Sequence, residues 1–142
     1  MSGYRAKKLV FSAVVTALIS MTVVTTTRAA DASGCWSGYW VSCKSGHKGR
    51  LQATICKVDE ERYRANFKGR FWKLFPFKYS VTLRVVETDG ETMTLKGSSY
   101  LGRIMGTFSY KATVTENKFD ATYSSCKDYG KWVMTRCCST CE

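Results

Sequence analysis

The sequence predicts an all-β fold, a single eight-stranded antiparallel up-and-down barrel, with a two-sheet β-sandwich as the alternative. Three observations predict it. Polar and apolar residues alternate with a period of two through most of the chain, which is typical of half-buried strands. Short polar turns separate these runs at regular spacing. The chain has only one proline, Pro76, and no segment has convincing helical periodicity.

The alternating runs define the strands in order along the chain. RYRANFKGRF shows the pattern most clearly, with basic residues on one face and aromatic or small residues on the other. Asp59–Glu61, Thr88–Glu91 and Glu116–Asn117 are compact polar turns, and LGRIMG is a looser bend. Asp-Gly between alternating runs is a strong hairpin signal. The expected strands are 35–42, 50–57, 62–71, 77–87, 91–98, 106–115, 118–125 and 129–136.

Closure into a barrel is favoured over a sandwich because it removes both exposed sheet edges. Small inward residues alternate with aromatic ones, which either fills a tapered interior or leaves room for a ligand. The small inward positions are Gly38, Ala53, Ala65, Gly69, Gly97, Ala112 and Ala121.

The N-terminal segment reads as a secretory signal peptide over residues 1–32, followed by one β-barrel domain over residues 33–142. Arg5, Lys7 and Lys8 precede an apolar stretch, and Ala30 and Ala32 supply small residues before the expected cleavage point. The alternative is an uncleaved membrane anchor. We therefore expect export to the periplasm, cell envelope or exterior.

The part after residue 32 is strongly basic. Four of the 22 basic residues and one of the 11 acidic residues lie in the leader, which leaves a net charge of +8 on the rest. Such a surface favours anionic partners, here an acidic polysaccharide or a lipid surface. Nucleic acid is not expected because an exported protein rarely meets it.

The seven cysteines all follow the leader, which in a small exported domain predicts disulfides. The first and last strands should pair antiparallel, which makes a Cys43–Cys126 bridge plausible; Cys35 should lie almost opposite Cys56. The odd number leaves one cysteine for a free thiol, an intermolecular bond or a lipid. The candidates are Cys35, Cys43, Cys56, Cys126, Cys137, Cys138 and Cys141.

No cofactor, metal site or catalytic set is expected. The cysteines show no recurring zinc-finger spacing. The single histidine, His47, lies in a glycine-flanked turn with no identifiable nucleophile or orienting group. The acidic residues gather in solvated turns rather than in the buried settings that general acid–base catalysis uses.

Two sets of side chains are candidates for binding. Arg62, Arg64, Lys68 and Arg70 share one outward strand face, at a spacing of about 6 to 7 Å that suits a linear polyanion. An inward set of aromatic residues forms either the core or the wall of an apolar pocket. Its members are Trp36, Trp40, Tyr63, Phe67, Tyr79, Phe108, Tyr110, Tyr123 and Trp132.

The two ends of this domain resemble the lipocalin and avidin-like barrel families. The first strand carries Gly-x-Trp twice, in GCW and GYW, and the last strand, KWVMTR, ends in Arg136. The resemblance implies that Trp36 packs beside Arg136 and closes the barrel floor, with Arg136 nearer to Trp36 than to Trp40. No C-terminal helix follows the last strand.

The segments GRFWKLFPFKYSVTL and LGRIMGTFSYKATVTENKFDATYSS are similar to exported proteins of planctomycete-type bacteria. This resemblance implies export and no particular activity. From the residues we expect a non-enzymatic binding module, which holds either an anionic envelope polymer on its outer face or a small apolar ligand inside. The alternative is a structural component of the cell envelope that is cross-linked through cysteines.

Overall fold

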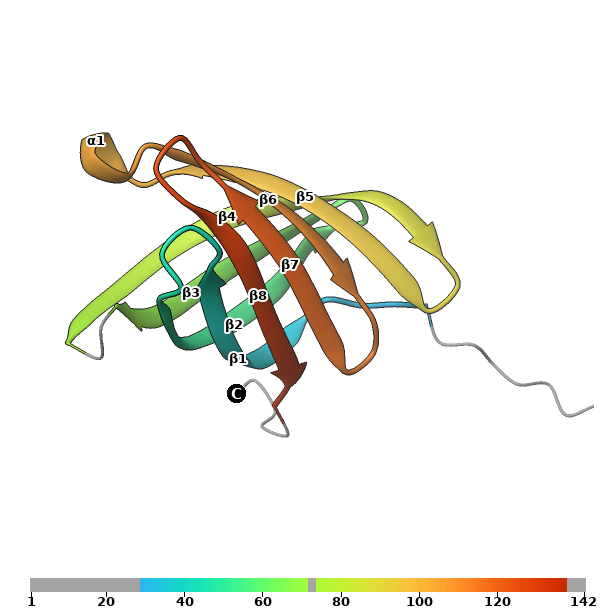
Figure 1. The fold of residues 1–142 in the computed structure, drawn as a ribbon. Helices are drawn as coiled ribbons and strands as arrows, with labels where there is room; N and C mark the ends of the chain where they lie inside the picture. The colour runs from blue at the N-terminus through green and yellow to red at the C-terminus, as the bar shows by residue number, and fades with distance from the viewer. Residues whose placement is uncertain (1–28, 72–73, 138–142) are drawn as a thin grey trace, which may run out of the picture.

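The computed structural model describes residues 29–71 and 74–137, and these residues form one closed antiparallel barrel. Figure 1 shows its eight strands and a single short helix at one end. The elements are β1 (Gly34–Ser42), β2 (Lys48–Asp59), β3 (Arg62–Phe71), β4 (Phe75–Asp89), β5 (Thr92–Tyr100), α1 (Gly102–Met105), β6 (Thr107–Val114), β7 (Lys118–Ser124) and β8 (Tyr129–Arg136).

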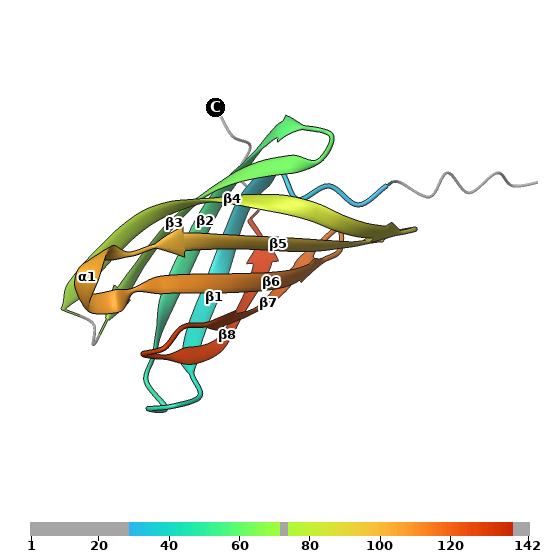
Figure 2. The same ribbon diagram turned by 90° about the horizontal axis from the view of Figure 1, so that it is seen from above.

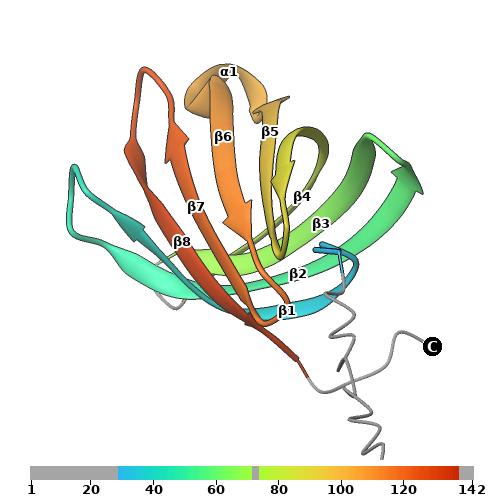
Figure 3. The ribbon, with the colours of Figure 1, turned by 90° about the vertical axis from the view of Figure 1, so that its right-hand side faces the viewer.

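Each strand pairs antiparallel with the next along the chain, and β8 returns to pair with β1. The β1–β8 register runs from Trp36 opposite Arg136 to Ser42 opposite Gly130. Figure 3 shows the strands curving around one interior, and Figure 2 shows β4–β6 crossing over the opposite wall. The up-and-down barrel is therefore confirmed, and the sandwich alternative is excluded.

The observed strand bounds lie within two residues of the expected ones. β2 and β4 each extend two residues further at both ends, so β4 begins at Phe75 and includes Pro76 near its start, where a missing N–H is tolerated. The expected bend at 101–106 contains the four-residue helix α1. Within the described residues, no helix is long and apolar enough to cross a lipid bilayer.

The expected inward aromatic residues face the barrel interior. All of them are buried except Tyr79, which is half-buried. At the end where β8 finishes, the interior is filled by closely packed side chains, and the Trp36 and Phe119 rings meet edge to face at 5.6 Å. We call this the closed end. Other fully buried residues of the core are Leu51, Ile55, Leu83, Leu95, Val114 and Met134.

Arg136 ties the closed end together. Its guanidinium carbon lies 4.3 Å from the centre of the Trp36 ring, so the contact expected from the lipocalin-like pattern is present. Its nitrogens donate to the backbone oxygens of Glu116, at 2.5 Å, and Asp31, at 2.7 Å, and also to that of Ser33. One side chain thus joins the β6–β7 turn, the segment before β1 and the last strand.

The packed domain reaches further toward the N-terminus than residue 33, where we expected it to start. Ala30 and Ala32 are buried, and the Trp36 indole N–H donates to the Ala32 oxygen at 2.9 Å. The expected signal peptide otherwise falls on residues 1–28, outside the described part of the chain, and it stays a prediction.

The two predicted disulfides are wrong. Cys43, Cys56 and Cys126 are exposed thiols. The β1–β2 register sets Cys35 opposite Thr54, so Cys56 lies two residues further along β2 and faces Arg64 of β3 instead.

At the other end, the Cys126 sulfur lies beside Gly106, whereas the Cys43 N–H donates to the Tyr129 oxygen. Cys137 donates its N–H to the Cys35 oxygen at 2.8 Å, which places these two cysteines side by side. Cys138 and Cys141 lie outside the described residues.

Replacing Arg136 should weaken the closed end. Arg136→Gln removes the cation–π contact and charge-assisted hydrogen bonds, so we expect the free energy of unfolding to fall by about 2–4 kcal/mol. Arg136→Lys should lose at least half as much because an ammonium cannot reproduce the guanidinium fork. Denaturant unfolding followed by tryptophan fluorescence measures both. Arg84→Gln, on the exposed wall, is the control, and equal losses in Arg84→Gln and Arg136→Gln would contradict the assignment.

Candidate functional site

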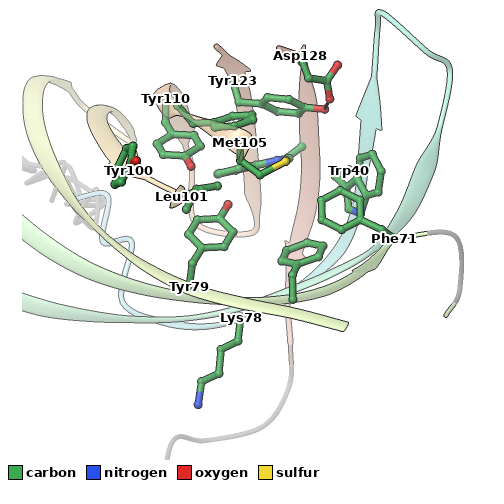
Figure 4. Close-up of a pocket in the computed structure, with 13 residues that line it drawn as sticks. Trp40, Phe71, Lys78, Tyr79, Tyr100, Leu101, Met105, Tyr110, Tyr123 and Asp128 are labelled. Atoms are coloured by element: carbon green, nitrogen blue, oxygen red, sulfur yellow. Dashed lines mark hydrogen bonds between the residues drawn. The ribbon is translucent and has the colours of Figure 1, made fainter. Parts of the chain in front are cut away.

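An aromatic cavity of about 390 Å³ opens at the end of the barrel opposite Arg136. We call this the open end; the β1–β2, β3–β4 and β7–β8 connections and α1 gather there. Figure 4 shows its side chains arranged around a common space. The lining residues are Trp40, Phe71, Phe77, Lys78, Tyr79, Tyr100, Leu101, Met105, Phe108, Tyr110, Tyr123, Asp128 and Trp132.

Stacked rings form the cavity wall. Tyr110 lies between Tyr79 and Trp132, with ring centres 6.3 Å and 4.9 Å away, and Trp132 also contacts Tyr123 at 5.9 Å. Room for Tyr123 comes from Gly130, because a Cβ at that position would lie 2.7 Å from the tyrosine hydroxyl. The inward alternation of the strands thus places aromatic faces toward one another across the interior.

One side of the cavity mouth is held by a polar network. The Tyr123 hydroxyl donates to Asp128 Oδ2 at 3.1 Å, and the Ser42 hydroxyl donates to Asp128 Oδ1 at 2.6 Å. The Ser45 N–H in turn donates to the Ser42 hydroxyl oxygen at 3.0 Å. These bonds connect the β1–β2 loop to the β7–β8 loop. Burial, together with the Asp128 carboxylate, raises the pKa of Tyr123 above its usual range.

The Tyr110 hydroxyl is the unusual polar group of the cavity. Tyr110 is 4% exposed, and its hydroxyl oxygen makes no hydrogen bond of good geometry within the described chain, although the Ser99 and Tyr79 hydroxyls lie nearby. Figure 4 shows the Tyr79 and Tyr110 hydroxyls pointing toward one another across the cavity. Burial raises the pKa of both, although the nearby Ser99 and Tyr79 hydroxyls offset part of the effect at Tyr110. Both groups therefore stay neutral and can donate a hydrogen bond at physiological pH.

The rest of the cavity offers little reactive chemistry. The Lys78 side chain points away from it, as Figure 4 shows, and the Trp40 indole N–H donates to the Arg70 oxygen at 3.3 Å. His47 lies on the exposed rim beside Ser45 and Phe71. Within residues 29–71 and 74–137, no group of histidine, cysteine and carboxylate side chains is arranged to hold a metal ion.

The expected anion-binding residues all face outward, but the structure divides them. The Arg62 guanidinium pairs with the Asp59 carboxylate at 2.5 Å and is thereby partly neutralised. Lys68 and Arg70 instead border a shallow outer groove that Arg50 and Lys78 also line, with Lys68 directly opposite Lys78. Arg64 is exposed on the same strand but does not line this groove.

Arg50 and Lys78 were absent from the expected set because they lie on the neighbouring strands. Alternation within one strand shows which residues share its face, whereas the register between strands decides which residues meet. Pairing the strands from their hairpin turns was the signal that would have set Lys78 opposite Lys68 and brought Arg50 to the same groove.

The fold and the cavity define a closed up-and-down barrel with an aromatic site at one end. The chain matches no protein-family model, and it matches no curated protein sequence.

The buried tyrosines make stability sensitive to alkaline pH. The unfolded chain releases phenolic protons near pH 10, but the raised pKa of Tyr79, caused first by burial, keeps its proton in place in the barrel. The folded state then binds more protons than the unfolded state, so the free energy of unfolding falls as the pH rises above about 10.

We expect part of the tyrosinate absorbance to appear only together with unfolding in an alkaline titration. Tyr79→Phe should move the alkaline unfolding midpoint to higher pH, because one of the groups that drives unfolding is gone. Tyr39→Phe, on the exposed wall, is the matched control and should leave the midpoint in place. Complete ionisation of every tyrosine before any loss of structure would contradict this account.

Proposed function

We propose that the protein is an exported, non-enzymatic binding module that holds a small, flat, largely apolar ligand in the aromatic cavity. The observation that carries the proposal is the Tyr110 hydroxyl, which is buried without a partner in the wall of a cavity of about 390 Å³. Pockets that hold small molecules have volumes of roughly 300–1,000 Å³ and combine apolar walls with a few polar groups. This cavity has that composition.

The side chains also indicate the chemistry of the ligand. The aromatic walls favour a planar ligand that offers its faces to rings such as Tyr110 and Trp132. Tyr79 and Tyr110 offer hydroxyl donors, which favours a ligand that carries a hydrogen-bond acceptor such as a carbonyl oxygen. Asp128 is the carboxylate of the cavity, and Lys78 points outward, so a negatively charged ligand is disfavoured.

The unpartnered hydroxyl is better explained by a ligand than by folding. A buried polar group without a partner destabilises the folded state by about 1–3 kcal/mol. A phenylalanine at position 110 would keep the stacking and avoid this penalty. A ligand with a hydrogen-bond acceptor would pair with the hydroxyl. Binding would then remove the free-energy cost of the unpaired hydroxyl in the empty barrel, and this gain would contribute to the affinity for the ligand.

Tyr110→Phe should therefore separate binding from stability. The probe is prodan, a neutral naphthalene ketone dye whose fluorescence responds to its surroundings. We expect Tyr110→Phe to weaken prodan binding about tenfold, while the free energy of unfolding stays level or rises by up to about 1 kcal/mol. Binding is followed by fluorescence titration and stability by denaturant unfolding.

Tyr63→Phe is the matched control, since Tyr63 is buried near the closed end and the Asp31 carboxylate lies close to its hydroxyl. It should lower stability by about 1 kcal/mol and leave prodan binding unchanged. Dimethylaminonaphthalene, which lacks the ketone, should bind Tyr110→Phe and the natural protein alike. Equal prodan affinity in the natural protein and Tyr110→Phe would argue against the assigned donor, and no prodan binding would argue against the cavity as the site.

We propose, as a second candidate, that the outer groove binds a linear anionic polymer of the cell envelope. The observation that favours it is the direct opposition of Lys68 and Lys78 in a groove, where their like charges repel and a bound anion would neutralise them. Arg50 and Arg70 lie beside this pair in the same groove. The described salt bridges do not involve any of the four.

Neutralising the groove should remove salt-sensitive adsorption to polygalacturonate, a linear acidic polysaccharide. We expect the double change Lys68→Gln and Lys78→Gln to weaken adsorption about tenfold, because two facing cations are lost where the polymer would lie. Arg62→Gln with Arg64→Gln removes the same charge outside the groove and should have a smaller effect. If the two double variants bind equally, the groove is not a specific site.

A further inference from the structure

Large apolar side chains gather around the open end on the outside of the barrel. Leu74 is 76% exposed, Tyr100 65% and Ile104 85%, and they come from the β3–β4 connection, the end of β5 and α1. Phe75 and Tyr129 add exposed rings at the same end. The other large exposed apolar residues of the described chain, Tyr39, Val58 and Val86, lie away from the open end and are less exposed than Leu74, Tyr100 and Ile104.

These side chains belong to one rim rather than to separate loops. Phe75 and Met105 line the same hollow at the mouth, and Tyr100, Leu101 and Met105 all line the cavity behind it. In Figure 1, α1 and the start of β4 lie at the same end of the barrel. An exposed apolar rim of this kind marks an interaction surface.

Charge is distributed unevenly along the barrel. The open end carries the exposed cations Lys44, Lys48, Arg103 and Lys127. Among the described residues of its connections, the one carboxylate is Asp128, which accepts hydrogen bonds from Ser42 and Tyr123. The turns of the closed end carry the acidic residues Asp59, Glu60, Glu61, Asp89, Glu91 and Glu116.

An apolar rim surrounded by cations is complementary to a bilayer with anionic headgroups. Apolar side chains enter the boundary between headgroups and acyl chains, and lysine and arginine side chains contact the headgroups. A second copy of this chain fits less well, because two open ends facing each other would bring like charges together. The acidic closed end would point away from a negatively charged surface.

We infer that the open end is a docking surface for an anionic lipid bilayer. Leu74 and Ile104 enter the lipid interface, and Lys44 and Arg103 contact the headgroups. This orientation directs the cavity mouth toward the membrane. The inference goes beyond the proposed ligand binding and does not depend on it, because docking requires only the rim.

The test uses the full chain and vesicles of phosphatidylcholine with roughly one quarter phosphatidylglycerol, which gives a negative surface. Leu74→Ser with Ile104→Ser should lower vesicle binding about tenfold, since two inserted side chains are lost. Val58→Ser with Val86→Ser removes two exposed apolar side chains that lie outside the rim and should change binding less than about twofold. The N-terminal segment is common to all variants, so their differences report the rim.

The charges are tested in the same way. Lys44→Gln with Arg103→Gln should weaken binding about tenfold at low salt, whereas Arg84→Gln with Lys96→Gln removes the same charge from the wall and should have a smaller effect. Hydrogen exchange shows which part of the barrel contacts the vesicles. Vesicles should protect the backbone at 100–106 and leave the β4–β5 turn, at 89–92, unchanged.

Three results would overturn the inference. One is equal binding by the rim variants and their wall controls. Another is equal protection at the β4–β5 turn, and the third is equal binding to vesicles of phosphatidylcholine alone. A chain that ignores vesicles but forms a dimer, which Leu74→Ser with Ile104→Ser dissociates, would assign the rim to a second copy instead. Prodan binding is unaffected by any of these results, so the two proposals fail separately.

Discussion

The pairing of β1 with β8 is the constraint on which the rest of the structure depends. It converts a curved sheet with two unpaired edges into a barrel with none. Two glycines permit the close approach: a Cβ on Gly38 would lie 1.9 Å from the Val133 oxygen, and one on Gly130 would lie 1.9 Å from the Val41 oxygen. Arg136 then fixes one end of this seam through its contacts with Trp36, Asp31 and Glu116.

Closure makes the two ends of the interior different. At the closed end, large side chains fill the space, and Trp36 and Arg136 both find hydrogen-bond partners in the segment that precedes β1. The open end has no equivalent filling. Its rings stand around a cavity, its polar network holds only one side of the mouth, and the Tyr110 hydroxyl has no partner. The rigid closed end supplies the support, so the open end can carry features that do not stabilise the fold.

The fold could be predicted from sequence because its signals are local. Alternation of polar and apolar residues indicates each strand, and a short polar turn indicates each hairpin. Strand bounds and inward faces can therefore be predicted without knowledge of the partner strands. The inward position of Trp132 or Phe67 is a property of its own strand. The predicted Cys35–Cys56 bridge failed because it depends on register, and a shift of two residues separates these two cysteines. Register likewise brings Lys78 opposite Lys68 in the groove, whereas Arg62 lies at the other end of β3 and pairs with Asp59.

Several features that reduce the stability or solubility of the protein occur together at the open end. An unpartnered buried hydroxyl, exposed leucine and isoleucine side chains, and cations with almost no counter-charge each reduce stability or solubility. Any one of them alone has an ordinary structural explanation. All of these features lie around one cavity, whereas the other end of the barrel is filled with side chains and held by hydrogen bonds. Packing alone does not explain this difference between the two ends. A ligand accounts for Tyr110 and an anionic lipid surface accounts for Ile104 and Arg103, and both would act at the same mouth.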